Sequence, residues 1–172
     1  MKFTTQLFLY WVSIFLIFFL AIIVIMSVFW GLNLTIWQAL SVFLIAGVVP
    51  PAIISLILYK RLNYMESEDL QPPAFHGSKQ ATFKFKSHSK HPFDDILQRI
   101  DRQWIISYSD RPNHVVKFRT DARMISWGIG GYVKMIAEDQ LLVVVYPIFE
   151  NSRREERIMN QTLRLMQAIL NP

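Results

Sequence analysis

The first third of the chain is a long apolar run without charge. From Phe3 to Tyr59 the sequence holds no Asp, Glu, Lys, Arg or His. As a single helix this run would be roughly 85 Å long, far more than the ~30 Å hydrocarbon core of a bilayer. Glycine and asparagine interrupt it at residues 31–34. The pattern therefore predicts a hairpin of two transmembrane helices within residues 1–61, over about 7–30 and 36–59.

Aromatic residues and flanking charges indicate how this hairpin lies in a membrane. Amphipathic rings settle at the headgroups, and the ends of the two predicted spans carry Tyr10, Trp11, Trp30, Trp37 and Tyr59. Lys2 precedes the first span, Lys60 and Arg61 follow the second, and the connection between the spans is uncharged. The positive-inside rule then predicts that both termini are cytoplasmic and that the protein is integral to the cell (inner) membrane.

Two adjacent prolines, Pro50 and Pro51, lie in the middle of the second predicted span. A proline inside a helix removes a backbone donor and bends the helix, which leaves carbonyl groups to be satisfied by other partners. The pair is therefore interpreted either as a hinge or as a kink that packs against the neighbouring helix. The sequence leaves both interpretations open.

The rest of the chain carries every charge except Lys2 and has the pattern of a small soluble domain. Proline, glycine and polar residues predict a linker over residues 62–79. Residues 80–172 predict a cytoplasmic α+β domain, with a strand at 82–87, a short helix after residue 91 and an antiparallel meander over about 104–146. Ser152-Arg153-Arg154-Glu155 is a capping box that opens a long closing helix. The predicted fold class is a membrane hairpin followed by a β-meander packed against a C-terminal helix.

Charge and cysteine content narrow the range of partners. The chain has a net charge of +5 and no cysteine, which excludes disulfides and thiolate chemistry. Basic residues near the predicted membrane surface are candidates for contact with anionic lipid, namely Lys60, Arg61, Lys79, Lys84, Lys86 and Lys90. The alternative for the lysines is a solvated strand face. A second basic group is expected on one face of the sheet, namely Arg111, Lys117, Arg119 and Arg123. Nucleic-acid binding is not expected, since exposed aromatic residues that could stack on bases are not evident.

The residues that could carry chemistry have simpler structural explanations. One cluster has the composition of a metal site, namely His88, His91, Asp94 and Asp95. Acids near a helix start are expected on electrostatic grounds, however, and lysines flanking His88 would repel a cation. Asp110 and Asp121, at predicted strand ends near His114, suggest acid–base chemistry, but turns recruit aspartate for backbone reasons. We therefore expect no catalytic residue, no metal and no cofactor.

One short pattern resembles that of known sequences. Ser126-Trp127-Gly128, a strand, the run 141–147 that ends in proline, and the closing helix resemble small uncharacterised bacterial membrane-anchored proteins. The likeness covers about residues 93–170. Those relatives usually have an acid after the glycine, where this chain has Ile129. The resemblance implies an α+β domain type and no activity.

These patterns favour a membrane-anchored interaction module, which is an accessory, assembly or scaffold subunit. Its partners would be the lipid bilayer and other membrane or cytoplasmic proteins, or further copies of itself. The alternative is a membrane-tethered sensory domain, or one that binds a lipid or another small molecule in an apolar pocket, lined by Trp104, Trp127, Tyr132 and Met135. The other explanation of these four residues is ordinary core packing. An enzyme is the least favoured class.

Overall fold

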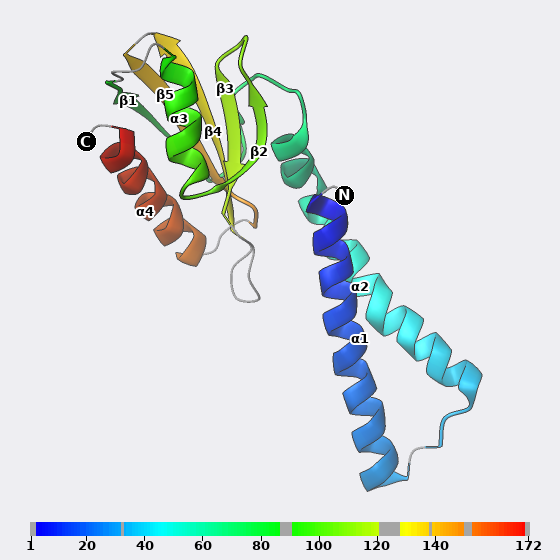
Figure 1. The fold of residues 1–172 in the computed structure, drawn as a ribbon. Helices are drawn as coiled ribbons and strands as arrows, with labels where there is room; N and C mark the ends of the chain where they lie inside the picture. The colour runs from blue at the N-terminus through cyan, green and yellow to red at the C-terminus, as the bar shows by residue number, and fades with distance from the viewer. Residues whose placement is uncertain are drawn as a thin grey trace. The chain divides into compact units, whose positions relative to one another are not determined.

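Two long apolar helices form the N-terminal part of the chain (Figure 1). The structure is a computed structural model and describes residues 3–31, 33–86, 91–120, 128–137, 139–149 and 153–170. Helix α1 is Phe3–Trp30 and helix α2 is Ile36–Glu66. Both are long and apolar enough to cross a membrane. A capping box begins α2, because the Thr35 and Gln38 side chains each accept a hydrogen bond from the other residue's backbone N–H.

Helices α1 and α2 approach each other at a small residue of α2. Gly47 is buried, and a Cβ placed on it would lie 2.3 Å from Cδ2 of Leu16. A larger side chain at this position would require the Leu16 side chain to move. Pro50 and Pro51 lie inside α2, which is a single helix from residue 36 to residue 66. The hinge at these two prolines stays a prediction.

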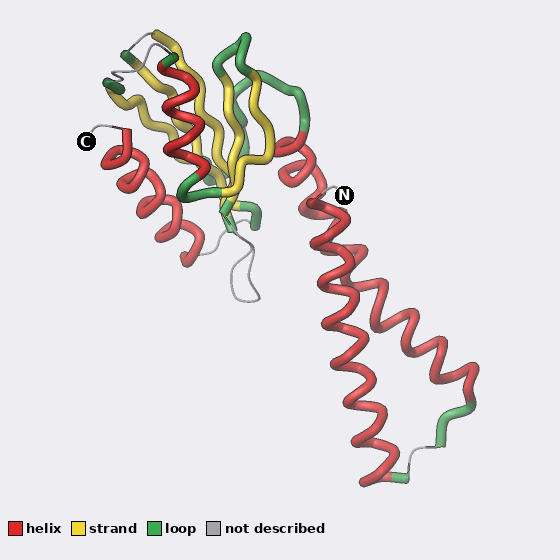
Figure 2. Tube along the Cα trace, in the orientation of Figure 1, coloured by secondary structure: helices red, strands yellow, loops and turns green. Residues whose placement is uncertain are grey.

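The second part of the chain is an antiparallel sheet with two helices. Its elements are β1 (Lys79–Lys84), α3 (Pro92–Asp101), β2 (Ile105–Asp110), β3 (Val115–Arg119), β4 (Ile129–Ala137), β5 (Gln140–Pro147) and α4 (Arg153–Leu170). The strand order is β1-β5-β4-β3-β2, and every neighbouring pair is antiparallel. Strands β2 to β5 form a meander, and β1 pairs with β5 at its far edge (Figure 2). The predicted meander with a closing helix is confirmed.

Helices α3 and α4 cover one face of the sheet, which we call the core face (Figure 1). Side chains alternate between the two faces along each strand, so that Phe118, Val133 and Val143 all point to the core face. Both helices bury an apolar stripe against these residues, and Ile96 of α3 and Met166 of α4 are completely buried. The domain thus has its main apolar core between the sheet and this pair of helices.

Two adjacent glycines in β4 allow aromatic rings to lie over the sheet on both faces. A Cβ at Gly131 would lie 2.0 Å from the ring of Phe118, which belongs to the core face. A Cβ at Gly130 would lie 2.3 Å from the ring of Tyr146, which belongs to the opposite face. The absence of a side chain at each position therefore makes room for one ring from a neighbouring strand.

The segment before β1 differs from the predicted linker over residues 62–79. Residues 62–66 continue helix α2, and the residues that follow contact the sheet. The hydroxyl of Tyr64 donates to the carbonyl of Gln71, and the hydroxyl of Tyr132 donates to the carbonyl of Leu70. The prediction gave weight to proline, glycine and polar content, whereas the apolar and aromatic residues of the segment decide its packing.

Candidate functional site

The second face of the sheet, opposite the core face, carries a buried lysine. Lys117 of β3 alternates with the core residues Val116 and Phe118, and its side chain is fully buried. In the strand register Lys117 pairs with Tyr108 of β2 on one side and with Tyr132 of β4 on the other. An ammonium group is rarely buried without partners. The contacts of Lys117 therefore indicate what this face of the sheet binds.

Lys117 binds the C-terminal end of helix α2. Its Nζ lies 2.9 Å from the carbonyl oxygen of Tyr64, 2.8 Å from that of Ser67 and 3.2 Å from Oγ of Ser67. The same atom lies 4.0 Å from the centre of the Tyr64 ring and 5.3 Å from that of Tyr108. Carbonyl groups at the end of a helix lack intrahelical partners and carry partial negative charge, so a cation is favourable there. The lysine therefore caps α2 from a neighbouring strand.

Burial affects the protonation of this lysine. Desolvation lowers the pKa of Lys117 from 10.5 to about 8, and the negative charge of Asp69 opposes that shift. A neutral amine keeps two N–H donors, which is enough for the two carbonyl groups. A lysine and a serine at this distance also have the composition of a base and a nucleophile. However, Oγ of Ser67 donates to the Tyr64 carbonyl at 2.9 Å, so the arrangement closes a helix end.

Arg61 forms the second part of this attachment. Its side chain is only 7% exposed, and its guanidinium donates to the carbonyl oxygens of Pro147 and His76. The guanidinium carbon lies 5.3 Å from the centre of the Phe75 ring. The planar group therefore binds the end of β5 and the turn before β1 together, which a lysine could not do with the same geometry.

Three aromatic rings fill the space next to these two cations. Tyr64, Phe75 and Tyr146 contact one another edge to face, with centroid distances of 4.9–5.9 Å. Burial raises the pKa of the Tyr146 hydroxyl well above its ordinary value, so this ring stays neutral. We call Arg61, Tyr64, Lys117 and Tyr132, with the rings that they contact, the helix-end cluster. It fixes residues 61–75 on the second face of the sheet.

The predicted lipid-contact residues have different roles in the structure. Arg61 belongs to the helix-end cluster and is buried, so it is not a lipid contact. Nζ of Lys79 lies 3.0 Å from the Glu156 carboxylate and 2.8 Å from the Asn160 side-chain oxygen. Lys60, Lys84 and Lys86 are exposed. Lys90 lies outside the described residues, as does Arg123 of the second basic group.

The predicted pocket residues do not come together. Trp104 packs on the core face, where its ring centre lies 5.1 Å from that of Phe118, and Met135 packs against the same core. Tyr132 points to the other face, towards Leu70. Trp127 lies outside the described residues. Trp104 and Met135 are thus accounted for by core packing, and Tyr132 by the helix-end cluster.

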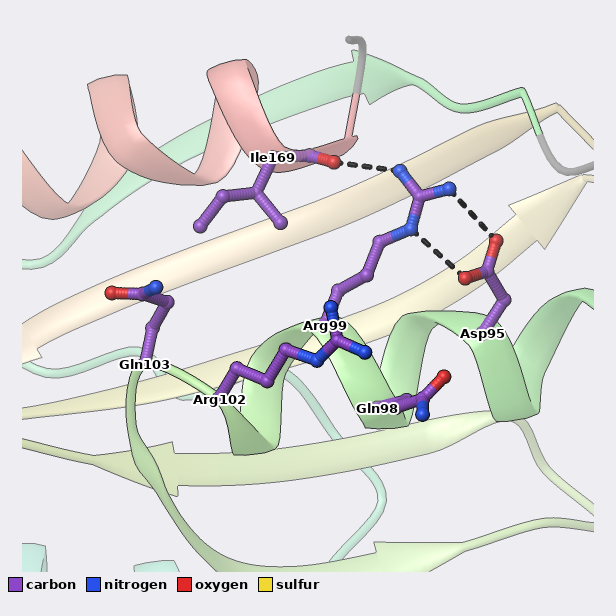
Figure 3. A pocket seen from close by; sticks show the side chains of 6 residues that line it. All are labelled: Asp95, Gln98, Arg99, Arg102, Gln103 and Ile169. Carbon is purple, nitrogen blue, oxygen red and sulfur yellow. Dashed lines mark hydrogen bonds and ion pairs between the residues drawn. The ribbon is translucent and has the colours of Figure 1, made fainter.

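Two hollows border α3, at its opposite ends. One, of about 450 Å³, lies beside Arg99, Arg102 and Ile169 (Figure 3). There Arg99 binds both carboxylate oxygens of Asp95, at 2.9 and 3.0 Å, and donates to the Ile169 carbonyl at 2.7 Å. Arg99 therefore connects α3 to the C-terminal end of α4, and its charge is taken up by these contacts.

The other hollow, of about 460 Å³, lies at the start of α3 beside His91, Asp94, Arg111 and His114. Asp94 and Arg111 form an ion pair at 3.3 Å, and both are well exposed. Across the described residues there is no group of three or more His, Cys, Asp or Glu that could hold a metal ion; His88 lies outside them. Hydrogen bonds from Asn113 lower the pKa of Asp110, which therefore serves the turn.

Sequence reasoning did not find the helix-end cluster, although one signal was present. Lys117 is a single charge within Val115-Val116-Lys117-Phe118, a run that is otherwise apolar. The basic composition of this region instead favours a common sheet face for Lys117, Arg111, Arg119 and Arg123. Comparison with known proteins adds no identity to this picture: the chain matches no protein-family model, and no curated protein is significantly similar to it.

Proposed function

We propose that this chain is a membrane-anchored interaction module whose two N-terminal helices span the membrane and hold a cytoplasmic docking domain at its surface. One observation carries the proposal: the helix-end cluster makes the C-terminal end of α2 part of the domain. The domain therefore begins within α2 itself, and no free tether separates the end of that helix from the sheet.

The length and surface of the helices support a membrane anchor. Helix α2 has 31 residues, or roughly 46 Å, so it exceeds the ~30 Å hydrocarbon core by about ten residues. Its last six residues belong to the sheet domain instead. Many large apolar side chains of the two helices are exposed, including Phe18, Phe29, Leu44 and Leu56. An apolar surface of this extent favours lipid over water.

The charges at the ends of the helices support the proposed orientation. In the sequence, Lys2 precedes α1, Lys60 and Arg61 follow the uncharged run, and residues 31–35 between the two helices carry no charge. Because only Lys60 separates Tyr59 from Arg61 in the sequence, the domain begins within one helical turn of the uncharged run. The domain would then meet its partners close to the cytoplasmic membrane surface.

The proposal is tested by the mass of the protein extracted from its native membranes. The full chain with a C-terminal affinity tag is extracted into mild detergent, purified in one step and measured by size-exclusion light scattering. We expect a protein mass well above that of one chain. Membranes washed in alkaline carbonate before extraction serve as the control for peripheral partners. Recovery of the chain alone, at the mass of one copy, would contradict the proposal.

A further inference from the structure

The exposed side of α4 carries a row of arginines. Arg153, Arg157 and Arg164 are all exposed, and their spacing of four and seven residues places them on one stripe of the helix. The stripe extends over roughly 16 Å of helix. We call these three residues the arginine row. Leu165, which is 50% exposed, lies at its side.

No acidic side chain of the described residues neutralises this row. None of the three guanidinium groups forms a hydrogen bond or ion pair within the part of the chain that the structure describes. The nearby acids are turned away, since Glu155 is buried and Glu156 binds Lys79. Three like charges on one helix face repel one another unless an anionic partner covers them.

The row lies on the side of the domain away from the helix-end cluster. Helix α4 covers the core face of the sheet, and its arginines point outward from that face. Residues 61–66 pack on the opposite face, through Arg61, Tyr64 and Lys117. Within the domain, residues 61–66 therefore lie on one side of the sheet and the arginine row on the other.

We propose that the arginine row is a docking surface for an acidic segment of a partner protein, an inference that rests on the proposed function. Guanidinium groups bind carboxylates in a planar, two-bonded geometry, and arginine is enriched at protein interfaces. Helix α4 has no aromatic residue that could stack on a base, so a nucleic acid fits the surface less well. Leu165 provides an apolar contact beside the charges.

The test measures binding of an acidic probe by the full chain in nanodiscs of zwitterionic phosphatidylcholine. The probe is a fluorescein-labelled peptide of about ten glutamates, which is longer than the row when extended. We expect R153Q/R157Q/R164Q to weaken binding about tenfold in fluorescence anisotropy. The control K84Q/K86Q/R102Q removes three exposed positive charges elsewhere, and we expect a change of less than about twofold. Equal losses in both variants, or no binding by the wild type, would overturn the inference.

A second measurement separates the bilayer from a protein partner. A single cysteine at the exposed Gln161, labelled with a dye, reports energy transfer to headgroup-labelled lipid in nanodiscs with and without phosphatidylglycerol. We expect equal transfer in both. A rise in anionic nanodiscs that R153Q/R157Q/R164Q abolishes would assign the row to lipid and overturn the inference.

In the extraction experiment, the same triple variant is expected to lose its partner. A complex that keeps its full mass in this variant would refute the docking role of the row and leave the proposed function intact.

Discussion

Replacing Lys117 by methionine is expected to free the end of α2 from the sheet. Methionine fills a similar volume but has no N–H group, so the carbonyls of Tyr64 and Ser67 lose their partner in a buried setting. Each unsatisfied buried carbonyl costs about 1–3 kcal/mol, and we expect a combined loss of about 2–3 kcal/mol. Amide hydrogen exchange of residues 62–71, measured by mass spectrometry in nanodiscs, should then rise about 30- to 150-fold.

The control for this experiment is K84M, which removes an exposed lysine from the edge strand β1 and should leave exchange unchanged. The residues at which the exchange rate rises are as informative as the size of the rise. A uniform rise across the whole domain would assign Lys117 to global stability, and no change at residues 62–71 would show that the lysine does not hold the helix end.

The pH dependence of stability provides a second readout of the same lysine. Its pKa is about 8 in the folded protein and 10.5 when unperturbed, so the unfolded chain binds more protons between these values. The free energy of unfolding therefore rises with pH in this window. Deprotonation of Lys117 removes its buried charge, and the neutral amine keeps two N–H donors. We expect the rise between about pH 8 and 9.5, below the titration of the tyrosines. It should be absent in K117M.

Replacing Arg61 by methionine is expected to open the segment between α2 and β1. The change removes the hydrogen bonds to the carbonyls of Pro147 and His76 and the contact with the Phe75 ring. Hydrogen bonds to a charged donor contribute about 1.5–3 kcal/mol each, and their partial replacement by water leaves an expected loss of about 2–3 kcal/mol. Chymotrypsin cleavage after Phe75, followed by mass spectrometry, should be about 30- to 150-fold faster if cleavage follows the open population.

A graded series distinguishes the geometry of Arg61 from its charge. R61K keeps the charge and can reach one carbonyl but not both, so its cleavage rate should fall between those of wild type and R61M. R102M, at an exposed arginine after α3, is the matched control. Wild-type cleavage in R61M would mean that Arg61 does not hold the segment, and equal rates in R61K and wild type would mean that charge alone is enough.

The sequence predicts secondary structure correctly in segments where a single hydrophobic periodicity dominates. The uncharged run to Tyr59 predicted two long apolar helices, and the α4 pattern predicted an amphipathic helix. The alternation of β2 to β5 predicted the antiparallel meander. In each case apolar burial along one element sets the structure, and burial of this kind is visible as a local pattern.

The helix-end cluster was not predictable in the same way, because its contacts join residues far apart in the chain. Lys117 reaches Tyr64 across 53 positions, and Arg61 reaches Pro147 across 86. A lysine in a strand is usually exposed, and only its three acceptors make its burial tolerable. For the same reason the sequence did not show that two of the predicted pocket residues lie apart. Trp104 and Tyr132 both have the composition of a pocket wall, and only the strand register shows that they point to opposite faces.

The central claim, a membrane hairpin that holds its domain in the cytoplasm, is tested most directly by thiol labelling in intact cells. The chain has no cysteine, so single cysteines can be placed at Asn33, between α1 and α2, and at the exposed Gln161 of α4. With a membrane-impermeant maleimide we expect labelling at position 33 in intact cells, and at position 161 only after the cells are permeabilised. Labelling of position 161 in intact cells, or labelling of both positions alike, would contradict the claim.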